Sequence, residues 1–443
     1  EKEITLLYCP HDDRYLPDSY VSGTCPYCGF SDAKGDQCDE CSKFLDPAQL
    51  KDPKCKLCGR KPEIRLDTHL FLDLPKAAPF LKKWIDSKKE WKGIIRNIPL
   101  QWIKEGLEPR CISRNLKWGT KIPRKGYEDK VFYVWFDAPI GYIAFTAEWT
   151  EKNKKDWKTW WQSKDTRIVH FLGKDNVPFH SIIWPCELMS NNKWTLPDYI
   201  VSNEYLNYEG KQFSKSREVG LFTSDITKLE FEPTIWRFYL SAIFPEHKDY
   251  NFDWHDMMEK TNNELVANIG NFWFRTLSFA KKHFGEVPLA ELNADDKKTV
   301  EKASKFSDKY VLKLENFEFK EALKTVLETS NLANQYFQKN EPWTLMKTDS
   351  ERCGTVINVC LSLSALIGKL MYPFIPSASR ELWVQLGYSK KDIDKKGLEC
   401  VLKTGQKLGE PKIIFKKMEK NTVEKYKKKF SGIKDNDNVS KNR

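Results

Sequence analysis

Six cysteines in the first 58 residues form three Cys-x-x-Cys pairs. Such a pair lets two thiolates from one tight turn bind the same ion, and two pairs complete a tetrahedral zinc shell. Three pairs in tandem, in a chain whose first residues show no secretory leader, favour zinc over a disulfide framework or a thioredoxin-like redox pair. The first zinc site is predicted at four cysteines: Cys25, Cys28, Cys38 and Cys41.

A second zinc site would use the third pair, Cys55 and Cys58. Its other ligands would be Cys9 with one of three neighbours: His11, Asp12 or Asp13. Cys9 also follows the apolar run 4–8, where a thiol at a strand end needs no metal, so both interpretations stay open. The other cysteines stand singly, as core or free thiols usually do: Cys111, Cys186, Cys353, Cys360 and Cys400.

Three apolar runs beyond the cysteines predict buried parallel strands, separated by helical stretches as in an α/β sheet. They span residues 131–136, 168–172 and 199–201. Ligands of open α/β sheets bind beyond the carboxyl ends of the strands. The polar and glycine-containing segments that follow these runs are therefore candidate binding segments.

One such segment contains Ser214, Lys215 and Ser216 in a short polar loop. An ammonium between two small hydroxyls can swing onto a triphosphate and neutralise charge during transfer without a covalent step. The same residues alone would fit an ordinary basic surface loop. Their position after a predicted strand favours phosphate binding.

The cysteine pairs, followed by the blocks at residues 133–142, 173–180 and 213–217, resemble the methionyl-tRNA synthetases. These are class I aminoacyl-tRNA synthetases, and the eukaryotic cytosolic branch is the most similar. The resemblance extends to about residue 390. The first two blocks are specific to this family, whereas the Ser-Lys-Ser loop is shared across class I.

The resemblance implies an α/β Rossmann-like catalytic domain with an inserted zinc-knuckle domain, followed by an all-α anticodon-binding bundle. Apolar residues at helical spacing, from Leu265 to Phe279, independently predict such a bundle. The expected domains are the knuckle insertion at 1–68, the second half of the catalytic domain at 69–250, the anticodon-binding domain at 251–390 and a basic extension at 391–443.

The resemblance also assigns residues to three binding functions. The methionine pocket is expected at Trp135, Ala138, Pro139, Tyr142, Asn176 and His180. ATP is expected at Gly173, Asp175 and Arg114, with catalysis by Lys215, Ser214 and Ser216. The CAU anticodon is expected at Asn271, Arg275 and Trp343. Aromatic rings suit a polarizable thioether, and an amide, a guanidinium and an indole suit unstacked bases.

The implied activity is that of a cytoplasmic methionine–tRNA ligase, which makes methionyl-adenylate from ATP and L-methionine and transfers methionine to the 3′ end of tRNA(Met). Structural Zn²⁺ and Mg²⁺ with ATP are the implied cofactors. Association with accessory proteins or a multi-synthetase assembly stays open. A mean hydropathy of −0.61, without an 18-residue apolar run, argues against a membrane partner.

Three departures from the family pattern limit these expectations. The His-x-Gly-His motif of class I enzymes is absent, so the chain is expected to lack the N-terminal part of the catalytic domain. Gln212 and Glu218 replace the usual lysine and glycine around the Ser-Lys-Ser loop. A catalytically incomplete tRNA-binding fragment, or another class I synthetase such as the cysteine or isoleucine enzyme, stays an alternative.

The net charge of +11 is unevenly distributed. Residues 401–443 hold 13 Lys and Arg against 5 Asp and Glu, which is 8 of the 11 charges. Such a segment is either a solvated lysine-rich end or an appendage that contacts a polyanion. In the second case, residues 416–429 would approach tRNA phosphates.

Overall fold

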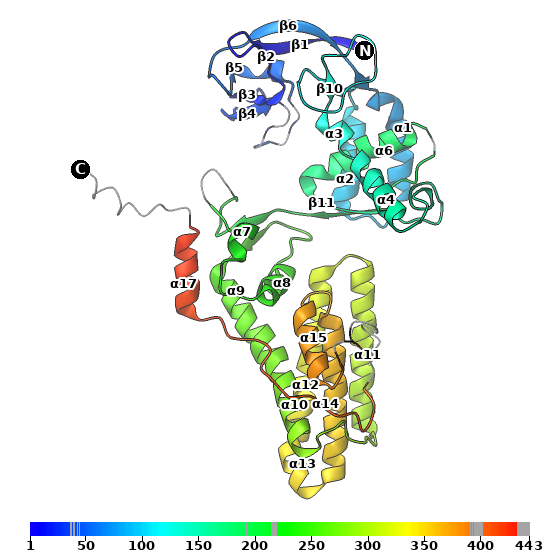
Figure 1. Ribbon diagram of the computed structural model, residues 1–443, viewed down its shortest axis with the longest axis vertical. Coiled ribbons are helices and arrows are strands. Elements are labelled where there is room, and N and C mark those ends of the chain that lie inside the picture. The colour runs from blue at the N-terminus through cyan, green and yellow to red at the C-terminus, as the bar shows by residue number, and fades with distance from the viewer. Residues whose placement is uncertain are drawn as a thin grey trace, which may run out of the picture. The chain divides into compact units, whose positions relative to one another are not determined.

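The computed structural model describes residues 1–35, 38, 40, 41, 43, 45–191, 193–213, 219–389, 391, 393 and 402–431. The chain forms two compact units, Glu1–Ser202 and Asn203–Arg443 (Figure 1). The boundary falls near the end of strand β12 (Tyr199–Asn203). The narrower domain ranges expected from the sequence stay predictions.

The first unit begins with two small antiparallel sheets. Strand β1 (Lys2–Cys9) lies between β2 (Arg14–Tyr15) and β6 (Glu63–His69). Strand β3 (Asp18–Thr24) lies between β4 (Ala33–Gly35) and β5 (Lys51–Cys55). Four of the ten buried residues in their common core are cysteines, so apolar packing alone is modest here.

The rest of the first unit mixes short strands with helices. The strands are β7 (Phe71–Leu72), β8 (Arg110–Cys111), β9 (Ser113–Arg114), β10 (Val131–Phe132) and β11 (Val169–Gly173). The α-helices are α1 (Leu74–Ser87), α2 (Gly93–Glu105), α3 (Val134–Asp137), α4 (Ile140–Lys152), α5 (Lys158–Trp161) and α6 (Trp184–Met189). Shorter turns are η1 (Pro47–Gln49), η2 (Lys174–Asn176) and the π-helical η3 (Phe179–Ile183).

Two of the three predicted strands exist, since β11 and β12 are neighbours in one sheet, and β12 is buried as predicted, whereas β11 is not, with Phe171 59% exposed. The prediction of a strand across residues 131–136 is wrong after its second residue. β10 pairs antiparallel with β9, and α3 follows, with the amide of Asp137 donating to the carbonyl of Tyr133 at 3.0 Å. Val134 is 60% exposed and Trp135 43% exposed, so the run is not covered on both faces. Short apolar runs do not distinguish strand from helix.

The second unit begins with strand β13 (Leu206–Tyr208), which pairs in parallel with β14 (Tyr250–Phe252). Helices α7 (Thr223–Ile226) and α8 (Pro233–Ala242) lie between these strands in the sequence. Helix α9 (Trp254–Lys260) continues through the π-helical η4 (Thr261–Gly270) into α10 (Asn271–His283). The later helices are α11 (Ala294–Glu315), α12 (Phe319–Asn340), α13 (Pro342–Thr348), α14 (Ser350–Met371) and α15 (Pro376–Gln385).

The predicted helical bundle is confirmed in this unit. Helices α10, α11 and α12 all pack against α14 (Figure 1). Helix α14 is long and apolar enough to cross a membrane, which was not predicted from the sequence. However, 72% of its apolar window is buried inside the protein. It is therefore the central helix of the bundle core.

The segment 402–431 runs along the surface of the second unit and packs several buried side chains against it. Phe415 packs on Trp273, and the backbone of Met418 forms two hydrogen bonds with the Asn262 side chain, at 2.8 and 3.0 Å. Helix α17 (Lys420–Lys429) then buries Val423 and Tyr426. The described part of the basic segment is thus an integral strap, with its lysines at the surface.

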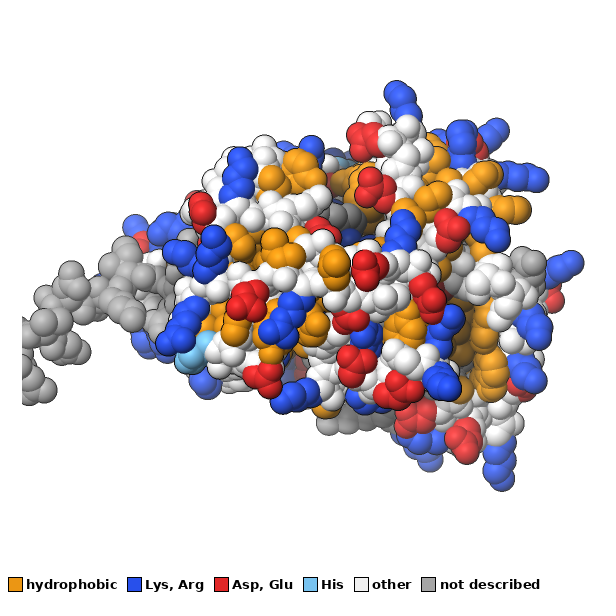
Figure 2. Space-filling view, turned by 90° about the horizontal axis from the view of Figure 1, so that it is seen from above, with side chains coloured by type: hydrophobic (Ala, Val, Ile, Leu, Met, Phe, Trp, Pro, Cys, Tyr) orange, Lys and Arg blue, Asp and Glu red, His pale blue; other side chains and the backbone are white. Residues whose placement is uncertain are grey.

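Charge on the described surface is mixed. Figure 2 shows a face on which acidic and basic side chains are interspersed with hydrophobic ones, so neither sign of charge dominates it. In the sequence, the excess of positive over negative charge lies mostly in residues 401–443.

Candidate functional site

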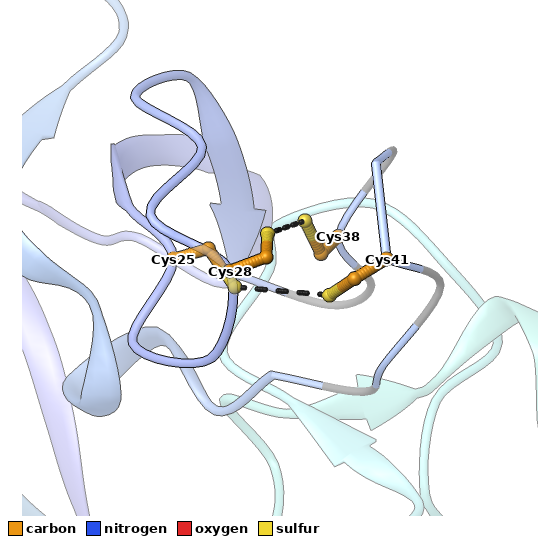
Figure 3. Close-up of side chains that lie close together, drawn as sticks. All are labelled: Cys25, Cys28, Cys38 and Cys41. Carbon is orange, nitrogen blue, oxygen red and sulfur yellow. Dashed lines mark hydrogen bonds between the residues drawn. The ribbon is translucent and has the colours of Figure 1, made fainter.

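Four cysteine thiols from two turns lie together in the first unit (Figure 3). The Sγ atoms of Cys25 and Cys41 are 3.9 Å apart, and those of Cys28 and Cys38 are 3.6 Å apart. All four lie within 4.8 Å of one another. A tetrahedral zinc ion with bonds of about 2.3 Å separates its sulfur ligands by about 3.8 Å. The set therefore fits zinc, and four thiolates leave no open position for catalysis.

A repeated backbone turn presents the thiols. The amide of Gly29 donates to the carbonyl of Cys25 at 3.1 Å, and Gly59 donates to Cys55 at 2.8 Å. Both glycines have positive φ, 79° and 73°, which other residues adopt at a cost. Burial raises the pKa of the Cys25 thiol, but backbone N–H groups of Cys28 and Tyr27 outweigh it and lower that pKa to about 7. At Cys25 the turn therefore favours the thiolate, the form that binds metal. At Cys28, a backbone hydrogen bond from Phe30 is outweighed by burial and the neighbouring thiols of Cys25, Cys41 and Cys38, which raise the Cys28 pKa to about 12.

A second cluster joins Cys9, Cys55 and Cys58 with Asp12, one of the three alternatives predicted for the fourth ligand. One Asp12 oxygen lies 3.1 Å from the Cys9 Sγ and 3.0 Å from the Cys55 Sγ. Hydrogen bonds from the thiols of Cys58, Cys55 and Cys9 lower the pKa of Asp12, so its carboxylate is ionised. The cluster supplies the donor types of a zinc site.

The His11 ring instead lies 3.1 Å from the other oxygen of Asp12, with its side chain 47% exposed. Because the carboxylate already reaches the thiols, the imidazole is held outside the cluster. Of the three predicted alternatives, Asp12 is thus the one whose carboxylate lies against the thiols, and a metal at this cluster stays a prediction.

Tyr142 and His180 meet where α4 approaches the π-helical turn η3. The Tyr142 hydroxyl lies 2.8 Å from His180 Nε2, and Nδ1 of the same ring lies 3.0 Å from the Asn176 carbonyl oxygen. A carbonyl only accepts, so Nδ1 carries the proton and Nε2 accepts from the hydroxyl. Burial lowers the pKa of His180, which keeps this ring neutral. π-helical turns occur frequently at functional sites.

Two residues that the sequence did not predict complete this aromatic cluster. The His170 ring lies 4.9 Å from Tyr142 and 5.1 Å from His180, and Trp184 lies 6.2 Å from Tyr142. Burial lowers the pKa of His170 to about 4. The four rings come from α4, β11, η3 and α6. Because they meet only in the fold, no local spacing signals them.

The other predicted pocket residues occupy the adjoining turns. Trp135 on α3 contacts Phe179, with ring centroids 5.1 Å apart. Ala138 and Pro139 form the corner between α3 and α4, and Asn176 ends η2. The aromatic cluster contacts β11 at His170, and η2 and η3 follow the carboxyl end of that strand, so a methionine pocket at these residues stays a prediction.

Gly173 ends β11, and Asp175 follows it on the exposed side of η2. A Cβ at Gly173 would meet nothing within 4 Å, so this end of the strand is open to a ligand. Arg114 forms an ion pair with Asp18 at 3.0 Å and stacks on Tyr133 at 4.0 Å. Its expected position at the nucleotide stays a prediction, since these contacts give it a structural partner.

The loop predicted to bind phosphates lies outside the described residues. Ser214, Lys215 and Ser216 belong to this gap, as do Arg217 and Glu218. Before the gap, the carbonyl of Lys211 accepts from the Tyr208 amide at 2.7 Å, in a turn through Glu209 and Gly210. Cys400 also lies outside the described residues.

Two of the three predicted anticodon residues, Arg275 and Trp343, lie against one buried ring. The Arg275 guanidinium carbon lies 5.0 Å from the centroid of the Phe337 ring, and the Trp343 ring lies 6.0 Å from the same ring. Asn271 is one helical turn before Arg275, and both are exposed on α10. Three chemically different side chains thus share one surface. Phe337 links Arg275 to Trp343 and was not predicted.

The α12 to α13 corner places the indole. Glu341 has φ 40°, and Pro342 begins α13, so the chain turns sharply before Trp343. The Cys353 thiol donates to the Pro342 carbonyl at 3.3 Å. Trp343 remains 41% exposed, so its ring is accessible at the surface of this unit.

Two family models match this chain. Residues 1–277 match the class I tRNA synthetases of the methionine type, and residues 287–435 match the anticodon-binding domain of methionyl-tRNA ligase. The chain belongs to the methionyl-tRNA synthetase family. The predicted family and the helical anticodon-binding domain are thereby confirmed.

Curated relatives in this synthetase family align over nearly the whole chain. The methionine–tRNA ligase of Methanopyrus kandleri is 44% identical over 431 residues, which cover 96% of this chain and 64% of that protein. The cytoplasmic methionine–tRNA ligase of Homo sapiens is 39% identical over 440 residues, 97% of this chain and 48% of that protein. The chain therefore spans about half to two thirds of the length of these synthetases.

Solved synthetase structures share the fold. The methionyl-tRNA synthetase of Mycobacterium tuberculosis bound by methionyl-adenylate aligns with a TM-score of 0.73 at 20% identity. The alignment covers 94% of this chain and 77% of that one. The fold of this chain is thus the fold of this synthetase family.

Proposed function

We propose that this chain contributes the methionine pocket and the anticodon-binding domain of a methionine–tRNA ligase. The reaction activates L-methionine with ATP to methionyl-adenylate and transfers it to the 3′ end of tRNA(Met). The observation that carries this proposal is the hydrogen bond of 2.8 Å between Tyr142 and His180 at the end of β11. It builds an aromatic pocket in which both polar groups already have partners.

This pocket suits a thioether chemically. Trp135, Tyr142 and His180 offer polarizable rings, against which sulfur makes favourable contacts of about 0.3–1.5 kcal/mol. The imidazole is neutral and its Nδ1 proton is used by Asn176. A charged side chain would therefore find no countercharge on this imidazole, whereas methionine needs none. Ala138 and Pro139 form the remaining wall.

ATP would bind beyond the open end of β11, with its ribose at Gly173 and Asp175 and with Arg114 nearby. The methionine carboxylate attacks the α-phosphate, the bond to the pyrophosphate oxygen breaks, and pyrophosphate leaves. Lys215, with Ser214 and Ser216, closes on the phosphates and stabilises their charge in the transition state. Mg²⁺ accompanies the triphosphate and is held mainly by substrate oxygens.

The anticodon would bind in the second unit. Trp343 offers a stacking plane, worth about 1–3 kcal/mol per base, while Asn271 and Arg275 reach base edges. The exposed position of all three side chains supports this assignment. Zinc at the cysteine clusters would be structural, and an ion at the second cluster would join β1 to β5, which belong to different small sheets.

The direct test is methionine-dependent ATP–pyrophosphate exchange by the full-length gene product. Tyr142→Phe and His180→Ala should both weaken methionine binding selectively. Absence of exchange from a folded, zinc-loaded full-length product would refute the proposal. Thermal shifts with methionine, cysteine and isoleucine would identify another class I specificity, because only the cognate amino acid should stabilise the protein.

A second candidate is a tRNA-binding fragment without catalysis. It is favoured by one observation, that the chain spans only 48% of the human relative. Gel-shift titration separates the two candidates. Binding of methionine tRNA by a chain that forms no adenylate supports the fragment.

The cellular setting is also proposed from the relatives. Several are named cytoplasmic enzymes, which supports a cytoplasmic location. Association with accessory proteins or with a multi-synthetase assembly fits the eukaryotic resemblance, and co-purification of the endogenous protein would test it.

A further inference from the structure

A polar network connects the exposed Arg275 to the interior of the bundle. Nη2 of Arg275 donates to Oδ1 of Asn334 on α12 at 2.8 Å. The Nδ2 group of Asn334 in turn donates to the Asn268 carbonyl at 3.1 Å, to the Asn268 side-chain oxygen at 2.9 Å and to the Ser330 carbonyl at 3.0 Å. The Nδ2 group of the Asn334 side chain therefore faces three hydrogen-bond acceptors.

This arrangement fixes which end of the Asn334 amide faces Arg275. Both Nδ2 protons are directed at oxygens that only accept, so the oxygen must face the guanidinium. The Asn268 side chain is itself oriented, because its oxygen accepts from the Ser330 hydroxyl at 2.9 Å and its Nδ2 donates to Asn331 at 2.8 Å. The acceptor for Arg275 is thus held in place from two elements, η4 and α12.

The guanidinium is held on two sides. Asn334 binds one edge, and the Phe337 ring lies under its face at 5.0 Å. Phe337 is one turn after Ala333 on α12 and is 3% exposed, so the ring cannot move away readily. The other edge of the guanidinium remains for a base, beside Trp343. A hydrogen bond to a charged group is also stronger than one between neutral groups.

We propose that Asn334, anchored by Asn268, is a positioning residue that orients Arg275 for base recognition and so contributes to anticodon specificity. This inference rests on the proposed anticodon-binding function. Asn334 acts through Arg275 and needs no contact with RNA itself. Removing it should free the guanidinium to rotate, which weakens its directional hydrogen bonds to a base more than its general attraction to phosphate.

The test is RNA binding by the full chain, with a hairpin that carries a CAU loop and a matched hairpin with one anticodon base changed. Asn334→Ala should weaken binding of the CAU hairpin about fivefold to tenfold, since one hydrogen bond is lost. Binding of the changed hairpin should alter little, so the preference for CAU falls. Gln335→Ala, on an exposed position of the same helix, is the control and should change neither affinity.

A double-mutant cycle decides whether Asn334 acts through Arg275. In an Arg275→Ala background, Asn334→Ala should have no further effect on CAU binding. Equal effects of Asn334→Ala in both backgrounds, or no effect in the parent chain, would overturn the proposal. Asn334→Leu keeps roughly the size but removes the acceptor that faces Arg275, and it should also lower the CAU preference if Asn334→Ala fails to fold.

The same binding measurements distinguish a failure of the proposed anticodon-binding function from a failure of the positioning role. If the unmodified chain does not prefer the CAU hairpin, anticodon recognition itself is wrong. If the unmodified chain prefers CAU and the Asn334 variants keep that preference, only the positioning role is wrong.

Discussion

The imidazole of His180 accepts a hydrogen bond from Tyr142 at 2.8 Å while it donates one to the Asn176 carbonyl at 3.0 Å. Both ring nitrogens are thereby used, and one tautomer is selected. The pair therefore presents polarizable surface with no free donor on the imidazole. This is the property that suits a neutral sulfur-containing side chain and disfavours a charged one.

Replacing Tyr142 with phenylalanine should weaken methionine binding about tenfold. The substitution leaves the buried Nε2 of His180 without a donor, and an unsatisfied buried group costs about 1–3 kcal/mol. The methionine KM in ATP–pyrophosphate exchange by the full-length product measures the effect. The KM for ATP should stay unchanged, and Tyr372→Phe in the second unit serves as the control. An unchanged methionine KM would contradict the proposed pocket.

The two cysteine clusters predict about two zinc ions per chain. Asp12→Ala should reduce the content to about one, because a carboxylate ligand of the second cluster is lost while the four thiols of the first remain. Inductively coupled plasma mass spectrometry on the purified chain checks this. His11→Ala is the matched control and should keep both ions, since His11 lies outside the four-donor cluster. A loss of zinc from the His11→Ala variant would instead indicate that His11 is a zinc ligand.

A buried ion pair in the bundle predicts acid sensitivity. Asp296 is fully buried and receives hydrogen bonds from Arg352 at 2.5 and 2.8 Å and from Tyr336 at 2.5 Å. Burial raises the pKa of Asp296, but the hydrogen bonds from Arg352 and Tyr336 outweigh it and lower the pKa below its usual value. The stabilisation is therefore present above the unfolded pKa of about 3.9 and is lost as pH falls through the lower folded value.

Arg352→Met should accordingly lower the free energy of unfolding by about 3 kcal/mol at pH 7, because it leaves a buried carboxylate without its partner. The difference from the parent chain should shrink as pH falls, because the buried carboxylate of the variant lacks Arg352 and is protonated at a higher pH than that of the parent. Urea titrations at a series of pH values, followed by circular dichroism, measure both quantities. A difference that is independent of pH would show that packing, not charge, dominates at this position.

The exposed lysines of the strap predict salt-dependent RNA binding. Changing Lys416 and Lys417 to glutamine removes charge without removing the buried anchors of the strap. If these lysines meet phosphates, the slope of log K against log salt should become shallower by about 0.7–0.9 for each phosphate that is no longer neutralised. Filter binding of methionine tRNA at several salt concentrations measures it. The same change at Lys297 and Lys298, which are exposed on α11, should leave the slope unchanged.

The spacing of residues in the sequence predicted the features that depend on contacts between near neighbours in the chain. The Cys-x-x-Cys pairs bring thiols together because each turn is closed within a few residues, around Gly29 and Gly59. Likewise, the helical spacing of Leu265 and Phe272 predicted the bundle, and both side chains are completely buried. Asp12 was among the alternatives for the second cluster, and only the fold places its carboxylate, rather than the His11 ring, against the thiols.

What could not be predicted depends on contacts between distant residues. Phe337 and Asn334 come within reach of Arg275 across about 60 positions, and nothing in their own neighbourhood marks them. The strand predicted at residues 131–136 failed for a related reason, since apolar residues there remain exposed at Trp135. Burial is a property of the whole fold, and a short apolar run does not reveal it.

The strap at residues 402–431 has a consequence for the order of folding. Its contacts join positions far apart in the chain, as between Asn262 and Met418 and between Glu230 and Tyr426. During synthesis, the bundle helices leave the ribosome well before this strap does. The apolar surface at Trp273 therefore stays exposed until the strap has been synthesised. A chain arrested before residue 402 is expected to expose this surface and to bind chaperones.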